Sequence, residues 1–475
     1  MITMASHNDI LEFEKYVCDS ASFFRNGKLT KKIRLISHLD ADGIASAAII
    51  IKMLARMGID YELSTVPQLN EKFMFALRSE NYSNYIFTDV GSGQLTDIIS
   101  HFHEKSMAVL IIDHHRIKGD TSLEYSQSLL KKNICHVNPH IFGIDGATEI
   151  SSSGVAFMFA KAVDPANADL AHLAIIGAIG DVQEKKGFRE LNQKILDMAV
   201  ENKVLSLRKA INFFGLQTKS IGRMIESSSN LYIPSITGDR IKTNAFLNSL
   251  GIDPNKRYYE LTDDERDRLV ERIIKFRKQY FIDKPEDIYA SEYLIEGEKD
   301  GSVFRDVREF STLLNACGRL NRPDLGIGSC LMDEKLRAEA LENLREYKSE
   351  IVNALTWYDT NKEEGFVDFG KRYVIVNAKD NISPTIIGTL ASILSKTKLV
   401  ESNKYVLTMA RNEDNTTKIS LRYSGKVPDK NLRDVLNGII DKIGGESGGH
   451  DFAAGAIIEQ KIEDEFIEHF KRLFE

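Results

Sequence analysis

KKIRLISHLDADGIASAAIIIKMLARMG, residues 31–58, decides the fold of the first part of this chain. Residues 31–37 form an apolar run that predicts a buried strand, and residues 43–58 predict a helix. Two more short apolar runs, YIFTDV at 85–90 and MAVLIID at 107–113, are typical of buried strands. Strands that alternate with helices in this way indicate an α/β domain with a mostly parallel sheet and helices on both faces.

Acidic and histidine residues gather at the ends of these apolar runs. Ligands bind beyond the carboxyl ends of the strands in such sheets, so we expect four clusters to meet there, each at a strand terminus. Alternate residues of an extended stretch project to the same side, which predicts that His38, Asp40 and Asp42 converge before Gly43 turns the chain into its helix. The other three clusters are Asp89, the run Asp113-His114-His115, and Asp181 at the end of the apolar segment ADLAHLAIIGAIGD (168–181).

The chemistry of these side chains indicates a site for divalent metal ions. Carboxylates and imidazoles without a thiolate suit Mn²⁺, with Mg²⁺, Co²⁺ and Zn²⁺ as alternatives. Two ions about 3.5–4 Å apart clamp a phosphate and activate a bridging water, and we assign the bridging carboxylate to Asp89. The competing interpretation is a set of capping acids and surface histidines, since an aspartate at a strand end is usually a turn residue. Four such clusters in one α/β domain favour the metal site.

The remainder of the chain divides into three further regions. Residues 201–330 are predicted to be mainly helical, with a capping box from Thr262 to Glu265 and no catalytic cluster. Apolar residues every three or four positions predict one long helix over 333–362. Strands at 371–378, 405–411 and 418–425, a helix at 383–394 with Pro384 in its first turn, and a glycine-rich loop in 444–450 then indicate a second α/β lobe. We therefore expect domains at 1–200, 201–330, 331–365 and 366–475.

The composition is that of an ordinary globular protein without a membrane segment. The chain has 475 residues, a hydrophobic fraction of 43% and a charged fraction of 28%. No run of 18 apolar residues and no signal sequence is present, so we expect a cytoplasmic protein. The four cysteines lack CxxC spacing, which argues against a disulfide framework or a zinc finger. The net charge of −7 argues weakly against nucleic acid as a partner, because acids reserved for metals contribute to it.

The motifs together resemble a known family. SHLDADG, FTDVGSG, IIDHH and GAIGD, in that order, are similar to the four motifs of the DHH phosphoesterases, and GGHDFAAG resembles the phosphate-binding loop of the DHH-associated domain. The archaeal RecJ-like nuclease branch matches best, since NPHIFGIDG (138–146) and RDVREFSTLLNACGRLNRPDLGIG (305–328) resemble it as well. The resemblance covers nearly the whole chain. It implies two α/β lobes, the DHH domain and a smaller DHH-associated domain, joined by a long helix and facing each other across a groove.

The resemblance also implies a role for each site residue. One ion would be held by His38, Asp40 and Asp89, and the other by Asp42, Asp89, His114 and Asp181. Asp113 and His115 would orient their neighbours or contact the scissile phosphate, so that the catalytic group is Asp89, Asp113, His114 and His115. The substrate would be held by Arg422, Gly448, Gly449 and His450, with Asn138 placed to reach the site. The loop has the sequence Glu446-Ser447-Gly448-Gly449-His450, where many relatives have three glycines before the histidine, which changes the expected position of one backbone donor.

The implied activity is a metal-dependent exonuclease on single-stranded DNA or RNA that works in replication or repair. Other branches of the superfamily hydrolyse oligoribonucleotides, cyclic dinucleotides or pyrophosphate, which leaves those substrates as alternatives. A eukaryotic replication-fork relative has lost its nuclease role and acts as a scaffold, but here every expected ligand is present. Archaeal relatives bind the GINS complex or a repair helicase, and residues 201–330 are the expected docking surface. The direction of digestion stays open.

Overall fold

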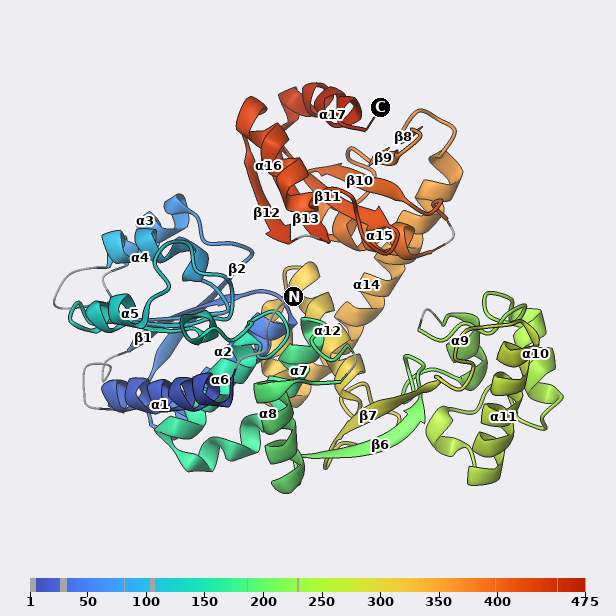
Figure 1. Ribbon diagram of the computed structural model, residues 1–475, viewed down its shortest axis with the longest axis horizontal. Coiled ribbons are helices and arrows are strands. Elements are labelled where there is room, and N and C mark those ends of the chain that lie inside the picture. The colour runs from blue at the N-terminus through green and yellow to red at the C-terminus, as the bar shows by residue number, and fades with distance from the viewer. Residues whose placement is uncertain are drawn as a thin grey trace. The chain divides into compact units, whose positions relative to one another are not determined.

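The chain folds into two compact units, Met1–Leu341 and Glu342–Glu475 (Figure 1). The structure is a computed structural model that describes residues 6–25, 32–80, 82–102, 107–185, 187–228, 230–397, 399–450 and 452–474. None of the helices in these ranges combines the length and apolar character that a bilayer span requires.

A five-stranded parallel sheet forms the centre of the first unit, in the order β2-β1-β3-β4-β5. Its strands are β1 (Ile33–His38), β2 (Tyr61–Val66), β3 (Asn84–Thr88), β4 (Ala108–Ile112) and β5 (Ile134–Val137). The three strands predicted from apolar runs are confirmed as β1, β3 and β4. Because all five strands run the same way, the motifs that follow β1, β3 and β4 meet at one edge of the sheet.

Helices cover both faces of this sheet, as the strand–helix alternation predicted. On one face, α3 (Glu71–Ser79), α4 (Leu95–His101) and α5 (Leu123–Leu130) contribute to a core with Phe87 and Ile111. On the other, α2 (Ala41–Arg56) packs against α6 (Ser152–Val163) and α7 (Ala171–Gly180), and α1 (His7–Phe23) packs against α6. Helix α8 (Glu190–Glu201) follows and contacts α7. The described residues of this unit include 3-10 turns at Ser92–Gln94, Pro139–Phe142, Pro165–Leu170 and Tyr258–Glu260.

The expectation that Asp181 ends a strand is wrong. The apolar segment before it forms α7, and Asp181 is the C-cap residue of that helix. A short run that is apolar on every side fits a buried helix as well as a buried strand, so periodicity did not separate the two. Gly177 and Gly180 allow this helix to approach closely, since a Cβ at Gly177 would lie 2.1 Å from Ser153 Oγ and one at Gly180 would lie 2.6 Å from Ala41 Cβ.

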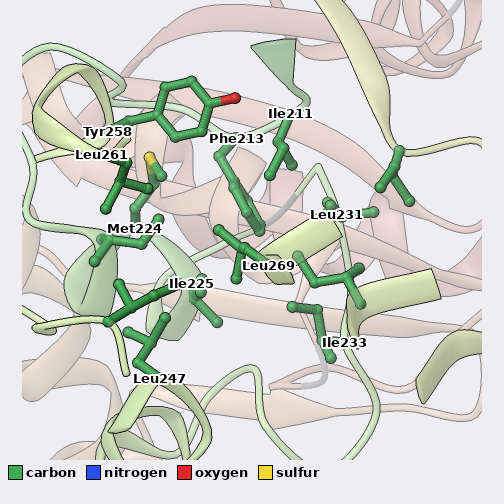
Figure 2. Close-up of a cluster of buried hydrophobic side chains, with 14 of the residues drawn as sticks. Ile211, Phe213, Met224, Ile225, Leu231, Ile233, Leu247, Tyr258, Leu261 and Leu269 are labelled. Atoms are coloured by element: carbon green, nitrogen blue, oxygen red, sulfur yellow. The ribbon is translucent and has the colours of Figure 1, made fainter. Parts of the chain in front are cut away.

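The region after α8 forms a second apolar core of its own. Strands β6 (Leu205–Ile211) and β7 (Tyr289–Ile295) pair antiparallel, and α9 (Ile221–Glu226), α10 (Arg240–Asn248) and α11 (Asp263–Gln279) lie between them in sequence. Figure 2 shows the buried side chains that these elements share. The predicted capping box of α11 is confirmed: Thr262 Oγ1 accepts from Glu265 N at 3.2 Å, and Glu265 Oε2 accepts from Thr262 N at 2.9 Å.

Two helices at the end of this region belong to the first core. Helix α12 (Val307–Arg319) contacts α7 and α2, and α13 (Pro323–Cys330) contacts α2. Gly318 makes the approach of α12 feasible, because a Cβ there would lie 1.9 Å from the carbonyl oxygen of Leu39. Helix α12 therefore lies directly against the HLDADG segment.

The second unit is built on a six-stranded sheet in the order β12-β13-β11-β10-β9-β8. The predicted long helix is confirmed as α14 (Glu334–Asn361), which runs through the boundary between the units. The strands are β8 (Val367–Phe369), β9 (Tyr373–Asn377), β10 (Lys404–Arg411), β11 (Thr416–Ser424), β12 (Glu446–His450) and β13 (Ala453–Glu459). The other helices are α15 (Pro384–Lys396), α16 (Leu432–Ile443) and α17 (Glu463–Arg472), and a 3-10 turn spans Gln460–Ile462.

The three strand predictions in the second unit are confirmed as β9, β10 and β11, and one loop prediction is wrong. Strands β10 and β11 are neighbours and antiparallel, and Pro384 opens α15. The predicted glycine-rich loop instead contains an edge strand, because residues 446–450 pair with β13. Glycine lowers strand propensity, but pairing with a neighbouring strand outweighs that preference here.

Candidate metal centre

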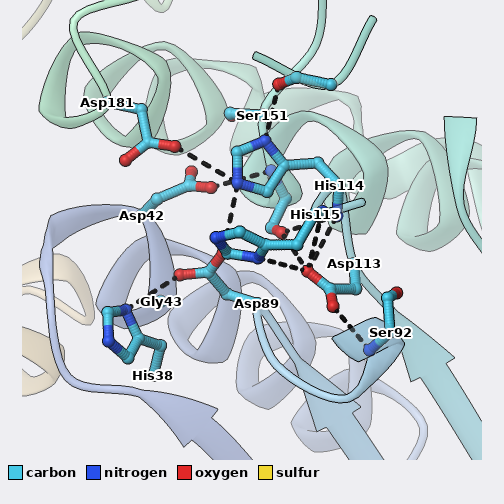
Figure 3. A network of polar contacts seen from close by, with 12 residues as sticks. His38, Asp42, Gly43, Asp89, Ser92, Asp113, His114, His115, Ser151 and Asp181 are labelled. Atoms are coloured by element: carbon cyan, nitrogen blue, oxygen red, sulfur yellow. Dashed lines mark hydrogen bonds and ion pairs between the residues drawn. The ribbon is translucent and has the colours of Figure 1, made fainter. Parts of the chain in front are cut away.

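Acids and histidines from four parts of the first unit meet at the carboxyl ends of its strands (Figure 3). Three sets of side chains each bring their ligand atoms within 4.8 Å of one another. The sets are His38, Asp40 and Asp89; Asp89, His114 and His115; and Asp42, His114 and Asp181. All six predicted metal ligands are therefore close together, and Asp89 and His114 each belong to two sets.

The HLDADG segment does not keep the strand-like alternation that we expected. His38 ends β1, Asp40 is the N-cap residue of α2, and Asp42 already lies in the first turn of that helix. Asp40 Oδ1 accepts a hydrogen bond from Gly43 N at 3.1 Å, and the turn that this produces sends Asp42 to a different set of ligands. The expected alternation is thus wrong, because the helix begins two residues earlier than predicted. His38 and Asp40 share one ligand set, and Asp42 belongs to another set of the same cluster.

Only a glycine fits at position 43 in this turn, because there is no room for a Cβ. A Cβ at this position would lie 2.3 Å from the carbonyl oxygen of His38. The glycine therefore lets the first turn of α2 lie against the end of β1.

Asp42 is fixed by the N-terminus of α6. Its carboxylate accepts from Ser152 N at 2.7 Å, Ser153 N at 3.1 Å and Ser153 Oγ at 2.5 Å. Backbone N–H groups at a helix start favour a negative charge, so they stabilise and orient the fully buried carboxylate there. Oδ1 accepts two of these hydrogen bonds and Oδ2 accepts one, so Oδ2 retains a lone pair for a cation.

Asp89 lies between two imidazoles. Its Oδ2 is 3.4 Å from His38 Nδ1, and its Oδ1 is 3.5 Å from His114 Nε2. The residue follows β3 with φ of 58°, in the left-handed region that non-glycine residues seldom occupy. A strained backbone conformation of this kind persists where the surrounding structure imposes it, and such strain is common at functional sites. Two oxygens that face opposite sides of the cluster suit a carboxylate shared by two ions.

The Asp113-His114-His115 run is held by hydrogen bonds from behind. Asp113 accepts from Ser92 N and His114 N, each at 2.9 Å, and from His115 Nδ1 at 2.8 Å. His114 Nδ1 donates to the carbonyl oxygen of Gly146 at 2.7 Å, because a carbonyl only accepts. The lone pair of His114 Nε2 therefore points into the cluster, 3.3 Å from Asp181 Oδ2.

Asn138 supports this run instead of facing a substrate. Its side chain is fully buried, and its Nδ2 donates to Ser92 Oγ at 2.8 Å and to the carbonyl oxygen of His115 at 2.9 Å. The predicted direct contact with substrate is wrong, because the amide has no exposed surface. His136 lies beside it, with its Nε2 2.9 Å from Ser92 Oγ, and burial lowers its pKa to about 4.

The buried acids carry more negative charge than their neighbours compensate. Burial, followed by repulsion from Asp40 and Asp42, raises the pKa of Asp89 to about 6. Burial and the same kind of repulsion raise the pKa of Asp181 well above its usual range. Burial opposes the protonation of His115, but Asp113 outweighs that effect and raises the pKa of His115 to about 10. A bound cation would remove the repulsion that produces the shifts in the two aspartates.

The geometry fits divalent cations. His38 Nδ1, Asp89 Oδ1 and His114 Nε2 are buried and make no hydrogen bond, although His38 Nδ1 lies 3.0 Å from Asp40 Oδ2. Buried polar atoms in proteins are normally satisfied, so three such atoms at one point require a partner. Neighbouring ligands of a six-coordinate ion lie about 3 Å apart when the bonds are about 2.1 Å, close to the spacing seen here.

Several residues of the centre were not predicted from the sequence. The run SSSG at 151–154 precedes an apolar stretch, so its helix-capping pattern was a usable signal for the α6 start that holds Asp42. Asn315 on α12, whose Oδ1 accepts from Ala41 N at 3.2 Å, had no local signal. Its partner lies 274 residues away in the chain.

The predicted phosphate-binding residues all lie in the second unit. Gly448 and Gly449 are on edge strand β12, and Gly449 has φ of 128°. Arg422 on β11 is half-buried, and its guanidinium donates to Ser392 Oγ at 3.0 Å and to the carbonyl oxygen of Leu421 at 2.8 Å. The side chain of His450 lies outside the described part of the chain.

Family models match three parts of the chain. The N-terminal domain of the DHH family matches residues 32–178, the DHH-CID domain matches 213–283, and the DHHA1 domain matches 370–475. An uncharacterised protein of Methanocaldococcus jannaschii is 32% identical over 440 residues, which are 92% of this chain and 91% of that protein.

Solved structures share the fold at low sequence identity. An exonuclease RecJ bound to manganese is 15% identical with a TM-score of 0.57, and the match covers 96% of this chain and 94% of that one. CDC45 from Entamoeba histolytica is 14% identical with a TM-score of 0.64, and the match covers 98% and 99% of the two chains.

Proposed function

We propose that this chain is a two-metal phosphodiesterase that removes nucleotides from the ends of single-stranded nucleic acid. The chain belongs to the DHH superfamily as a RecJ-like member. The observation that supports this most directly is the position of Asp89. Its two oxygens face two different imidazoles, and buried ligand atoms on both sides make no hydrogen bond. A purely structural cluster would have satisfied these atoms.

The side chains divide into two ligand sets around Asp89. His38, Asp40 and Asp89 would hold one ion, and Asp42, Asp89, His114 and Asp181 would hold the other. Two divalent ions bound there would neutralise the phosphate and supply an activated water. Mn²⁺ suits the mixed carboxylate and imidazole donors, and Mg²⁺ and Co²⁺ are the alternatives.

His115 would contact the phosphate. Asp113 Oδ1 holds its Nδ1–H at 2.8 Å, which fixes the ring and leaves Nε2 for the substrate. The side chain is 39% exposed, whereas Asp89 and Asp113 beside it are almost completely buried. An oriented imidazolium next to the ligand sets would stabilise the charge that develops on the phosphate.

The second unit would bind the nucleic acid through β12. An edge strand leaves alternate backbone N–H groups unpaired, and the absence of side chains at Gly448 and Gly449 lets a phosphate approach them. Contacts with phosphates of a single strand predict binding that weakens as salt rises.

A time course with Mn²⁺ on single-stranded DNA and RNA, each labelled at the 5′ or 3′ end, tests this function. Shortening of the labelled strand one nucleotide at a time is the expected result. Oligoribonucleotides, cyclic dinucleotides and pyrophosphate are run beside them, so that a preference for one of these would replace the proposed substrate. Asp89→Asn should abolish cutting, and Asp97→Asn, which removes an exposed acid on α4, should retain it. Intact single strands with folded wild-type protein would refute the proposal.

A scaffold role in a replication or repair assembly is the second candidate. The similarity to CDC45 supports it, and the intact ligand sets mean that it would accompany catalysis instead of replacing it. The GINS complex or a repair helicase would dock on the region between β6 and β7, where Phe281 and Ile241 are 95% and 82% exposed.

Substitution tests this docking better than deletion does. Removal of residues 201–330 would also remove α12 and α13, which pack against α2. Phe281→Ser with Ile241→Ser should reduce recovery of the GINS complex or the helicase in a pull-down and leave nuclease activity unchanged. Undiminished recovery of both partners would count against this surface.

A further inference from the structure

We infer that Gln183 is a positioning residue that holds His114 and the segment after Asp181 in one arrangement. The inference rests on the proposed function, because it concerns the ion that Asp42, His114 and Asp181 would hold. It assigns to these ligands a supporting residue that does not itself bind the ion. Gln183 has no ligand role itself. Its amide acts through the carbonyl group of Gly146.

The carbonyl oxygen of Gly146 accepts two hydrogen bonds. His114 Nδ1 donates to it at 2.7 Å, and Gln183 Nε2 donates at 2.9 Å. One bond fixes the protonated nitrogen of His114, so that the other nitrogen faces the ion. The second bond holds the acceptor itself. Gly146 lies close against the backbone of His114, since a Cβ at Gly146 would lie 1.9 Å from the carbonyl oxygen of His114.

Gln183 is anchored on its other side by α8. Its Oε1 accepts from Asn192 Nδ2 at 2.6 Å, and Asn192 N donates to the carbonyl oxygen of Glu149 at 3.0 Å. Gln183 is 5% exposed and Asn192 is 1% exposed. A chain of hydrogen bonds therefore runs from α8 through Gln183 and Gly146 to His114. Supporting bonds of this kind behind a metal-bound histidine orient the ring.

The side-chain amide of Gln183 also bears on the backbone conformation between Asp181 and Gln183. Val182 has φ of 61° and is 52% exposed, so a β-branched residue occupies the left-handed region without the support of burial. Such a conformation is unfavourable and persists only where neighbouring contacts impose it. Here the N–H groups of Val182 and Gln183 donate to the carbonyl oxygens of Ile179 and Ala178 at 3.0 Å each, so the backbone itself closes α7 in this conformation. The buried side chain of Gln183 ties this closed turn to the carbonyl group of Gly146, and its loss would free the turn that carries Asp181.

Gln217 provides a matched control. Its side-chain amide is also buried, donates once, to Glu292 Oε1 at 2.9 Å, and accepts once, from Gly301 N at 3.0 Å. It lies in the β6–β7 region and touches none of the metal-ligand segments. Replacement of either glutamine removes the same hydrogen bonds from a buried place, so only Gln183 should alter metal binding.

Titration calorimetry with Mn²⁺ on the full chain tests this inference. Wild-type protein is expected to bind two ions. Gln183→Leu should weaken one of the two by about tenfold and leave the other unchanged, whereas Gln217→Leu should change neither. The absorption spectrum of Co²⁺ in the same proteins should shift only for Gln183→Leu, because only there does an imidazole ligand reorient.

A milder variant serves if Gln183→Leu fails to fold. Asn192→Leu keeps Gln183 and removes its donor, and it should weaken the same ion by a smaller factor. Two wild-type affinities in the folded variants would overturn the inference, as would a lower melting temperature with unchanged affinities. A wild-type protein that binds no Mn²⁺ would instead refute the proposed function, and the inference with it.

Discussion

Two regions of the first unit bury carboxylates, and they do so in opposite ways. At the metal centre, Asp89 and the imidazoles around it keep ligand atoms without hydrogen bonds. At the start of α12, Glu292, Asp306 and Glu309 are equally buried, and we call these three the α12 acid group. Both oxygens of Glu292 and of Glu309 accept hydrogen bonds within the fold, and Asp306 Oδ1 accepts two.

The donors of the α12 acid group come from the β6–β7 region and from α12 itself. Glu309 accepts from Gln217 N at 2.9 Å and from the hydroxyl of Thr218, and Glu292 accepts from Arg208 Nε at 2.8 Å. Asp306 caps α12 by accepting from two backbone N–H groups. Burial of acids therefore does not by itself mark a functional site. Buried acceptors that lack donors distinguish the metal centre from a structural group.

The largest expected effect separates the two regions directly. Asp89→Asn should reduce nuclease activity by at least about a thousandfold, because the shared ligand is lost and both ions lose a carboxylate oxygen. The metal-free protein should not be destabilised, since Asp40 and Asp42 already repel the charge on Asp89. Rates with Mn²⁺ and melting curves in chelator measure the two effects. Loss of the fold in this variant would show that Asp89 is structural like the α12 acid group.

Much of this arrangement was accessible from the sequence. The parallel sheet and the grouping of six ligands followed from apolar runs that each end in an acid, because parallel strands place their carboxyl ends at one edge. Two local assignments failed for physical reasons. Asp42 lies on a helix since Asp40 caps it, and Asp181 ends a helix that is apolar on all sides and therefore carries no periodic signal.

Other parts of the site could not be predicted, because they depend on contacts between distant segments. Gly146 and Gln183 are 37 residues apart, and Asn315 reaches Ala41 from α12. Neither contact has a local pattern in the sequence. The edge strand β12 escaped prediction for the same reason, since its pairing with β13 outweighs the loop preference of its glycines.

Glu309→Ala should have the second-largest effect and should act on stability alone. The change leaves Gln217 N–H and the Thr218 hydroxyl buried without an acceptor, which costs about 2–3 kcal/mol. The increase in melting temperature on addition of Mn²⁺ should stay as large as in wild-type protein, because the α12 acid group holds no ion. Denaturant unfolding with and without Mn²⁺ measures both. A smaller increase in melting temperature than in wild-type protein would show that the α12 acid group contributes to metal binding.

The affinity for Mn²⁺ should depend on pH in the direction set by Asp89. Its pKa is raised to about 6, so below that pH a proton competes with the ions for the carboxylate. We expect the affinity to fall by about fivefold between pH 6 and pH 5 and to level off above pH 7. Calorimetry across this range measures the change. An affinity that is constant from pH 5 to pH 8 would mean that Asp89 is not a ligand.

The smallest expected effect comes from Asp306→Asn. Burial, followed by repulsion from Glu309, raises the pKa of Asp306 to about 7. The folded state then binds more protons than the unfolded state between about pH 4 and pH 7, so this contribution to stability is present at low pH and is lost as pH rises through 7.

Asparagine caps a helix as well as aspartate does and carries no charge. The variant should already be the more stable protein at pH 5, and its advantage over wild-type protein should grow by about 2 kcal/mol between pH 5 and pH 8, with unchanged binding of Mn²⁺. Unfolding curves at the two pH values measure the difference, and a variant that is less stable at pH 8 would show that the charge on Asp306 is fully compensated. In that case only Asp89 and its neighbours would retain negative charge that the fold leaves uncompensated. The α12 acid group would then differ from the metal centre in the repulsion between its carboxylates as well as in its hydrogen bonds.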